Sequence, residues 1–183
     1  GYYSPRKNLQ RLLEAYAALL RQELPEQPTL VLAGLSNSEH IAGMRSMLVE
    51  TELAETVLCL PHIPARELPL LYRSATLFVY PSLYEGFGLP VAEALACGTL
   101  VATSNRSSLP EIGGDACLYF DPYNTHSIAE ALYKGLTNRP LRERLCAKGP
   151  KRSLSFSWKQ SAEKILDVYQ QIGKRVPHDE RHV

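Results

Sequence analysis

Short apolar segments alternate with longer amphipathic patterns along most of this chain, and this alternation restricts the possible folds more than any other feature. The apolar segments are typical of strands buried on both faces. They lie at residues 29–34, 57–60, 76–80, 99–103 and 117–120. Helical patterns lie at 8–24, 38–49, 65–74, 90–97, 125–137, 141–152 and 158–172, with one turn at 109–112. The order predicts an α/β fold, a single doubly wound domain with a parallel sheet.

The ends of the chain add to this prediction. Asn8 stands where the first helix needs an N-cap, and Pro25 follows that helix as a stop signal. The opening Gly-Tyr-Tyr has the composition of a strand end, so we expect the chain to be part of a longer protein. Residues 176–183 are rich in charge, and we expect a loose tail there.

Composition excludes several classes of protein. The chain has 183 residues, 45% of them hydrophobic and 21% charged, which suits one globular domain. A net charge of +1 gives no indication of a nucleic-acid partner. The four cysteines form no close pair, which argues against a zinc site or a disulfide framework and favours the cytosol. We expect neither a signal peptide nor a membrane-spanning helix, since the sequence shows no leader pattern and no apolar run of the roughly 18 residues that such a helix needs.

The stretch YPSLYEGFGLPVAEALACG, at residues 80–98, joins a predicted strand to a predicted helix. Gly86 and Gly88 lack a Cβ, so the backbone there can turn sharply and approach a ligand closely. Pro90 suits the first helical position, and the amides of such a helix start can bind phosphate. The sequence has neither the GxGxxG nor the GxxxxGK[ST] pattern, so it does not predict a dinucleotide site or ordinary ATPase or GTPase chemistry.

Two glutamates, Glu85 and Glu93, bracket this turn, and Glu93 is expected in the first turn of the helix. An ionised carboxylate only accepts hydrogen bonds, so each glutamate suits a pair of neighbouring hydroxyls. A phosphate flanked by two diol-binding acids describes a nucleotide sugar. The alternative is that Glu93 complements the helix dipole, worth about 0.3–1 kcal/mol, while Glu85 is a solvated loop acid.

The glutamate pair resembles the E-x7-E motif of retaining glycosyltransferases with the GT-B fold, in the group-4 family that includes bacterial mannosyl- and glucosyltransferases. Other segments, up to about Tyr169, are similar to that family and follow in its order. They are SPRKN (4–8), LVLAG (30–34), ELPLLYRSATLFVYPS (67–82), SSLPEIGGDACLYFDP (107–122) and FSWKQSAEKILDVY (156–169). The resemblance implies the C-terminal, donor-binding Rossmann-like domain over residues 1–175, with its first strand truncated and the acceptor-binding domain upstream. The last helix resembles the segment that crosses back to that other domain.

The resemblance also implies a role for each matching residue. Glu85 would contact hydroxyls of the transferred sugar, Glu93 the ribose diol, and Lys7 the leaving diphosphate, which makes Lys7 and Glu85 the catalytic candidates. Lys7 could instead be a solvated surface lysine. The backbone that would face the diphosphate and sugar belongs to Gly86, Phe87, Gly88 and Leu89.

Two departures from the family pattern affect the predicted site. Many relatives have an arginine at the position of Tyr2, and Arg6 is a candidate to replace its charge. Relatives often have glycine where Pro61 stands, in the loop whose backbone, around Ile63, is the expected contact of the nucleobase. His62 lies in the same loop and is either a ligand contact or an ordinary half-exposed histidine.

No metal or other cofactor is expected, because the aspartates are isolated and the histidines show no ligand spacing. A basic helix side suits weak peripheral association with the inner face of an anionic membrane, although most such runs are solvated faces. Its residues are Arg144, Lys148, Lys151 and Arg152.

The predicted function is retaining transfer of a hexosyl unit from a GDP- or UDP-linked donor to an acceptor hydroxyl, and the RKN loop favours mannose from GDP-mannose. The acceptor would be a glycan or a lipid-linked sugar, held by the absent domain. The alternatives are a nucleotide-sugar binding module that is inactive on its own, and a structural domain that has lost its ligand. The Lys7, Glu85 and Glu93 set argues against the last of these.

Overall fold

The computed structural model describes residues 4–34, 38–50 and 52–175. The chain divides into two compact units, residues 1–153 and residues 154–183. The predicted strand end at Gly-Tyr-Tyr and the predicted tail at 176–183 lie outside the described residues.

The first unit alternates strands and helices as the sequence predicts. The strands are β1 (Leu30–Ala33), β2 (Val57–Leu60), β3 (Phe78–Tyr80), β4 (Val101–Ser104) and β5 (Cys117–Phe120). The helices are α1 (Leu9–Leu20), α2 (Ser38–Glu50), α3 (Leu68–Ser74), α4 (Leu89–Ala96), α5 (Leu109–Gly113), α6 (Thr125–Thr137) and α7 (Arg139–Ser153), and a 3-10 turn, η1, spans Pro5–Lys7. In the second unit, α8 (Trp158–Arg175) is an amphipathic helix.

All strand pairs that the structure describes are parallel, as predicted. The strands form two hydrogen-bonded groups, β1–β2 and β3–β4–β5. Pairs such as Leu32 with Cys59 and Ala102 with Leu118 fix the register in each group. A cavity of about 640 Å³ is lined by both β1 and β3, so it lies where the two groups face each other.

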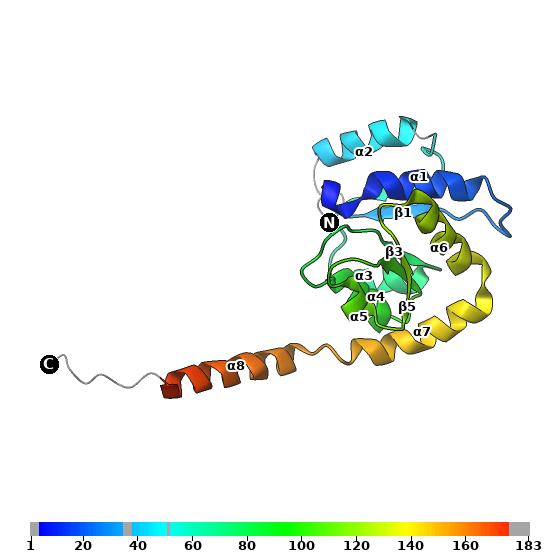
Figure 1. Cartoon of the computed structure of the whole chain (residues 1–183). Coiled ribbons are helices and arrows are strands. Elements are labelled where there is room, and N and C mark those ends of the chain that lie inside the picture. Colours follow the sequence, from blue (N-terminus) through cyan, green and yellow to red (C-terminus); the bar gives the residue numbers. More distant parts are fainter. Residues whose placement is uncertain (1–3, 35–37, 51, 176–183) are drawn as a thin grey trace. The chain divides into compact units, whose positions relative to one another are not determined.

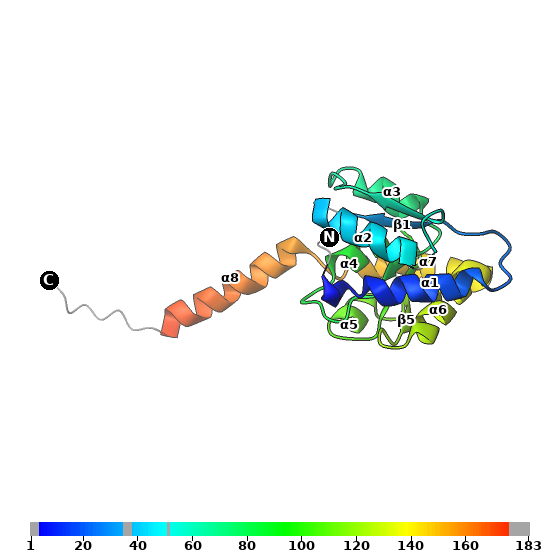
Figure 2. The ribbon, with the colours of Figure 1, turned by 90° about the horizontal axis from the view of Figure 1, so that it is seen from above.

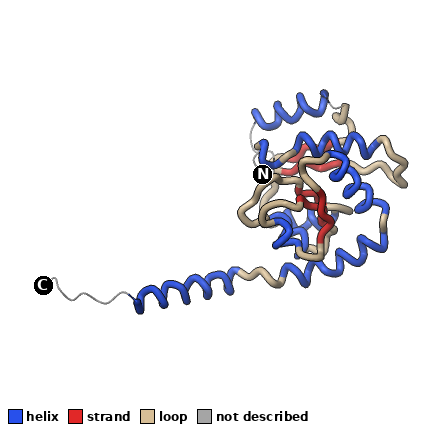
Figure 3. Tube along the Cα trace, viewed as in Figure 1, coloured by secondary structure: helices blue, strands red, loops and turns tan. Residues whose placement is uncertain are grey.

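Helices cover both faces of the strands, with α1 on one side and α4 and α5 on the other (Figure 1). On the first side α1 packs against α6, and the two helices lie side by side in both ribbon views (Figures 1 and 2). On the other side α4 contacts α3, α5 and α7. The short strands lie between these helices (Figure 3), which is the doubly wound arrangement. The central core combines apolar side chains of α1 and α6 with strand residues such as Ala102 and Phe120.

The first helix is shorter than predicted, and the residue before it has a role other than the predicted one. The first helix ends at Leu20, four positions before the last apolar residue of its pattern at Leu24. Asn8 does precede that helix, but its side chain makes no capping hydrogen bond, and its φ of 57° is left-handed. Instead the buried Asn8 amide donates to the carbonyls of Pro81, at 3.2 Å, and Pro122, at 2.7 Å. Asn8 therefore ties the loop after β3 to the segment after β5.

Replacing Asn8 with alanine is expected to lower the free energy of unfolding by roughly 2–4 kcal/mol. The change leaves two carbonyl acceptors without their donor and puts a Cβ-bearing residue with no polar group at a left-handed φ. Urea denaturation measures the loss. Asn8→Gly is the matched control, because glycine removes the same hydrogen bonds but tolerates the φ. A loss below about 1 kcal/mol in the alanine variant would contradict the structural role of this amide.

Candidate functional site

The turn η1 brings the SPRKN segment to the carboxyl end of β3. The amide of Leu83 donates to the carbonyl of Arg6 at 2.9 Å, and the Arg6 guanidinium donates to the carbonyl of Tyr84 at 2.7 Å. Ligands of doubly wound sheets bind at the carboxyl ends of strands. Lys7, predicted as a site residue, therefore lies where this fold places ligands.

Glu85 lies at the centre of a charged cluster. Its Oε1 accepts from Lys7 Nζ at 2.7 Å and from the Tyr80 hydroxyl at 2.9 Å, while its Oε2 pairs with Arg6 Nη1 at 2.7 Å. Lys7 Nζ also donates to the Tyr80 hydroxyl at 2.6 Å and lies over its ring, 4.9 Å from the centroid. The Glu85 side chain is only 11% exposed. The alternative of a solvated loop acid therefore does not describe Glu85.

These contacts keep Glu85 ionised. Burial by itself raises the pKa of Glu85, but hydrogen bonds, with that of Lys7 the largest, outweigh it and bring the pKa to about 2. The resulting contribution to stability is present above the ordinary pKa of 4.5 and is lost as the pH falls toward 2. The pKa of Tyr80 is raised, mainly by burial and against the opposing effect of Lys7, so its hydroxyl remains a donor.

Two serines from the loop before α5 hold the glycine-rich turn. Ser107 Oγ donates to the carbonyl of Glu85 at 2.6 Å, and Ser108 Oγ to that of Phe87 at 2.7 Å. Ser107 itself has a left-handed φ of 56°. The backbone from Glu85 to Phe87 is thus fixed by a segment more than 20 residues further along the chain.

The start of α4 has the geometry that its sequence predicts. Gly88 has a φ of 105°, and a Cβ there would lie 2.7 Å from a Leu109 methyl carbon, so only glycine fits. Around Gly86 there is open space, which is available to a ligand. The side chains of Phe87 and Leu89 are exposed beside it. The first amides of such a helix have no acceptor within the helix and suit an anion.

The sequence predicts Glu93 in the first turn of its helix, and this prediction is wrong. Because α4 begins at Leu89, Glu93 is its fifth residue, where the helix dipole has little effect. Its Oε2 accepts from the Tyr72 hydroxyl of α3 at 2.9 Å. Burial, and then the Glu93 charge, raise the pKa of Tyr72, so the hydroxyl stays a donor. This contact orients the Glu93 carboxylate and weakens its interpretation as a dipole residue.

The cavity between β1 and β3 collects several of the predicted residues. Lys7, His62, Ile63 and Glu93 line it together with Tyr80. The loop that is predicted to contact the nucleobase and the glutamate that is predicted to bind the ribose therefore line the same cavity. Glu85 and the backbone from Gly86 to Leu89 are not among the lining residues of this cavity.

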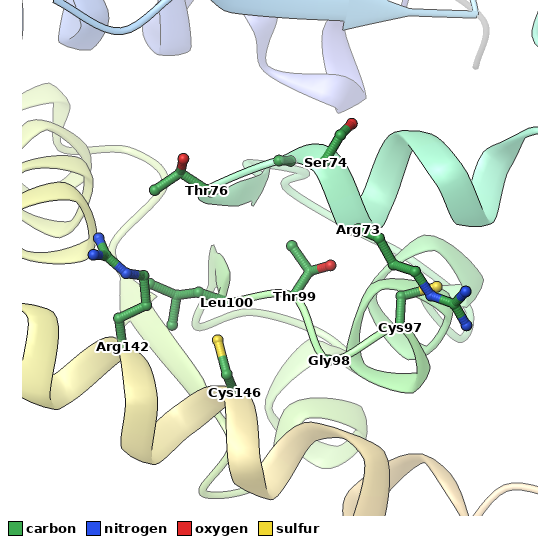
Figure 4. A pocket seen from close by; sticks show the side chains of 10 residues that line it. Arg73, Ser74, Thr76, Cys97, Gly98, Thr99, Leu100, Arg142 and Cys146 are labelled. Carbon is green, nitrogen blue, oxygen red and sulfur yellow. The ribbon is translucent and has the colours of Figure 1, made fainter. Parts of the chain in front are cut away.

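A smaller pocket of about 360 Å³ lies near the amino ends of β3 and β4 and is lined by Arg73, Thr76, Thr99, Arg142 and Cys146 among others (Figure 4). Its two arginines lie on opposite sides and do not converge on a common point. This pocket is at the wrong end of the strands for the ligand of a doubly wound sheet.

Two residues of the predicted basic helix side have partners within the domain, and the other two are exposed to solvent. Lys148 pairs with Asp115 at 2.5 Å, and Arg152 donates to the carbonyls of Ile112 and Glu111. Arg144 and Lys151 are exposed. In the residues that the structure describes, no helix is long and apolar enough to cross a membrane.

Sequence reasoning gave no role to Tyr72, Tyr80, Ser107 or Ser108. The tyrosines lie in a segment quoted for its resemblance, where a tyrosine among apolar residues usually signals core packing. No spacing rule links the serines to Glu85, because only the fold brings them together. Arg6, the candidate replacement for a charge at Tyr2, contacts Glu85, whereas Tyr2 lies outside the described residues. Within the described ranges, no group of three or more His, Cys, Asp or Glu side chains could hold a metal ion.

Comparison with solved structures identifies the class. Sucrose-phosphate synthase from Thermosynechococcus elongatus superposes with a TM-score of 0.82 at 27% identity, over 96% of this chain and 45% of that one. Trehalose-6-phosphate synthase OtsA gives 0.81 at 16% identity, over 93% and 42%. HepE of Anabaena, in complex with UDP and glucose, gives 0.80 at 18% identity, over 93% and 47%. The fold is the C-terminal Rossmann-like domain of a GT-B glycosyltransferase.

The family follows from sequence comparison. The model described as "Glycosyl transferases group 1" matches residues 1–152, and the chain belongs to that family, which confirms the resemblance. O-antigen chain mannosyltransferase B of Escherichia coli is 39% identical over 92% of this chain and 44% of its own length. The D-inositol 3-phosphate glycosyltransferase of Corynebacterium jeikeium is 32% identical over 91% and 41%. The chain spans less than half the length of these relatives.

Proposed function

We propose that this chain is the donor-binding domain of a hexosyltransferase, and that it binds a nucleoside diphosphate sugar at the carboxyl ends of its strands. One observation carries the proposal: Lys7 and Glu85 meet at 2.7 Å beside the start of α4, in a chain of the group 1 glycosyl transferase family. A half-buried cation beside a helix start suits a diphosphate.

The proposed roles follow from position. Lys7 and Arg6 neutralise the diphosphate, with the amides at Gly86 to Leu89 beside it, and Lys7 stabilises the negative charge that develops as the sugar leaves. Glu93, oriented by Tyr72, accepts from the ribose diol. The base lies against the loop of His62 and Ile63, which lines the same cavity as Glu93. Glu85 accepts from hydroxyls of the transferred sugar.

We further propose that the complete enzyme retains the configuration of the anomeric carbon and needs no metal ion. In the transfer, the bond from that carbon to the diphosphate breaks, a bond to the acceptor oxygen forms on the same face, and the acceptor proton passes to the departing diphosphate. Two cations near Glu85 supply charge that Mg²⁺ provides in other phosphate sites. The mannosyltransferase relatives and the RKN loop support GDP-mannose as the donor.

The acceptor, a glycan or lipid-linked sugar, would be held by an N-terminal domain, in the cytoplasm or at the inner face of the membrane. Without that domain, the second candidate function is nucleotide-sugar binding alone. The share of the relatives that this chain covers supports this second candidate.

Transfer assays separate the two candidates. A longer version of the protein that includes the upstream domain should move mannose from GDP-mannose to a mannose-ended acceptor, whereas the 183-residue chain should only bind the donor. NMR of the product should show an α linkage, the same configuration as in the donor. A β-linked product, or equal activity of the short chain, would contradict the proposal.

A further inference from the structure

Glu85 forms ion pairs with the two cations that a diphosphate would need. Lys7 Nζ and Arg6 Nη1 each lie 2.7 Å from a different carboxylate oxygen of Glu85. A diphosphate that accepts hydrogen bonds from these cations therefore competes with the carboxylate for their positive charge. The diphosphate and the Glu85 carboxylate are alternative anionic partners for the same two cations, Arg6 and Lys7.

The environment of Glu85 makes this competition costly for the carboxylate. Its side chain is 11% exposed, so loss of Arg6 and Lys7 would leave a largely buried negative charge. The Tyr80 hydroxyl, at 2.9 Å from Oε1, would remain as a neutral side-chain donor outside the cation pair. The same hydroxyl lies 2.6 Å from Lys7 and can hold the ammonium when Glu85 withdraws.

Hydroxyls of a hexose would replace the lost donors. A carboxylate has about four lone-pair sites, and Lys7, Tyr80 and Arg6 use three of them in the structure. A diphosphate that carries a sugar thus displaces Glu85 from the cations and also offers it hydrogen-bond donors. A diphosphate without a sugar does only the first.

We propose that Glu85 is a specificity-determining residue that favours the complete sugar donor over the free nucleoside diphosphate, by competing with the diphosphate for Arg6 and Lys7. This inference rests on the proposed function. It gives the chain a physical means of releasing the nucleoside diphosphate once the sugar has been transferred.

Isothermal titration of the 183-residue chain with GDP, UDP and inorganic pyrophosphate tests the inference. Glu85→Gln keeps the size of the side chain and removes its charge, and it should tighten binding of the best of these probes roughly tenfold. Glu130→Gln, which removes an exposed acid paired with Lys134, is the matched control and should change nothing. In a Lys7→Met background the gain from Glu85→Gln should shrink, because one of the two cations is gone.

The sugar donors provide the second readout. In the unaltered chain GDP-mannose or UDP-glucose should bind more tightly than the corresponding diphosphate, and Glu85→Gln should reduce or reverse that difference. If the diphosphates bind and Glu85→Gln leaves their affinity unchanged or weaker, the inference is wrong while the proposed function stands. If no probe or sugar donor binds either protein, the proposed function fails and the inference with it.

Discussion

Replacing Lys7 with methionine is expected to reduce sugar transfer by about 10²–10³-fold in a protein that joins this chain to its acceptor-binding domain. Loss of one preorganised group that faces a developing negative charge costs this much in other enzymes. Lys7 is largely buried and is held by Glu85 and Tyr80, so no solvent-exposed neighbour can take its place in the variant. Steady-state kinetics with saturating donor measures the loss in kcat.

The same substitution should weaken nucleoside diphosphate binding to the 183-residue chain by roughly thirtyfold or more, because it removes a partner of a desolvated charge. Lys134→Met is the matched control: it makes the same change at an exposed lysine that pairs with Glu130 at 3.9 Å. If both lysine variants lose similar activity, Lys7 contributes only general charge. If neither loses any, Lys7 is a structural lysine.

Replacing Glu93 with alanine is expected to raise the Kd for a nucleoside diphosphate by roughly ten- to a hundredfold. The ribose diol would lose its charged acceptor, and a hydrogen bond to a charged group is worth about 1.5–3 kcal/mol. Calorimetry with the diphosphate and with its sugar should show the same loss for both, since both contain the ribose. Glu85→Gln should differ by tightening binding of the diphosphate and reducing or reversing the preference for the sugar donor.

Tyr72→Phe is the control for this prediction. It leaves the Glu93 carboxylate in place and removes only the hydroxyl that donates to Oε2 at 2.9 Å. A smaller loss, below that of Glu93→Ala, is expected because the carboxylate still binds but is less well oriented. Unchanged affinity in a folded Glu93→Ala variant would mean that Glu93 is a surface residue of α4 with no part in nucleotide binding.

The sequence predicts most elements of this fold because its strands are short apolar runs and its helices keep one apolar face. Residues 57–60, 117–120 and 125–137 have the predicted bounds. The role of a side chain is mispredicted where a contact between distant segments decides it, as at Asn8, which precedes its helix as predicted but whose amide binds two carbonyls far along the chain instead of capping the helix. The left-handed φ of Ser107 is likewise invisible in a pattern of residue types.

The candidate site, like the fold, can be predicted from the sequence only in part. Local rules identify Gly88, because a sharp turn before a helix requires glycine, and carboxylate chemistry singles out Glu85 and Glu93. No local rule shows that Glu85 is neutralised by Arg6 and Lys7, which lie 78 or more positions earlier in the chain. That pairing is a property of the fold, and it changes the expected effect of replacing Glu85.

A thermal-shift panel with GDP, UDP, ADP and their sugars tests the central claim, that this chain binds a nucleotide sugar at the Lys7, Glu85 and Glu93 site. A ligand at 100 times its Kd should add about 2.7 kcal/mol of stability. We predict a clear rise in Tm with at least one nucleotide sugar, equal in EDTA and in excess Mg²⁺, and much smaller in the Lys7→Met variant. No rise with any ligand, or an undiminished rise in Lys7→Met, would contradict the account.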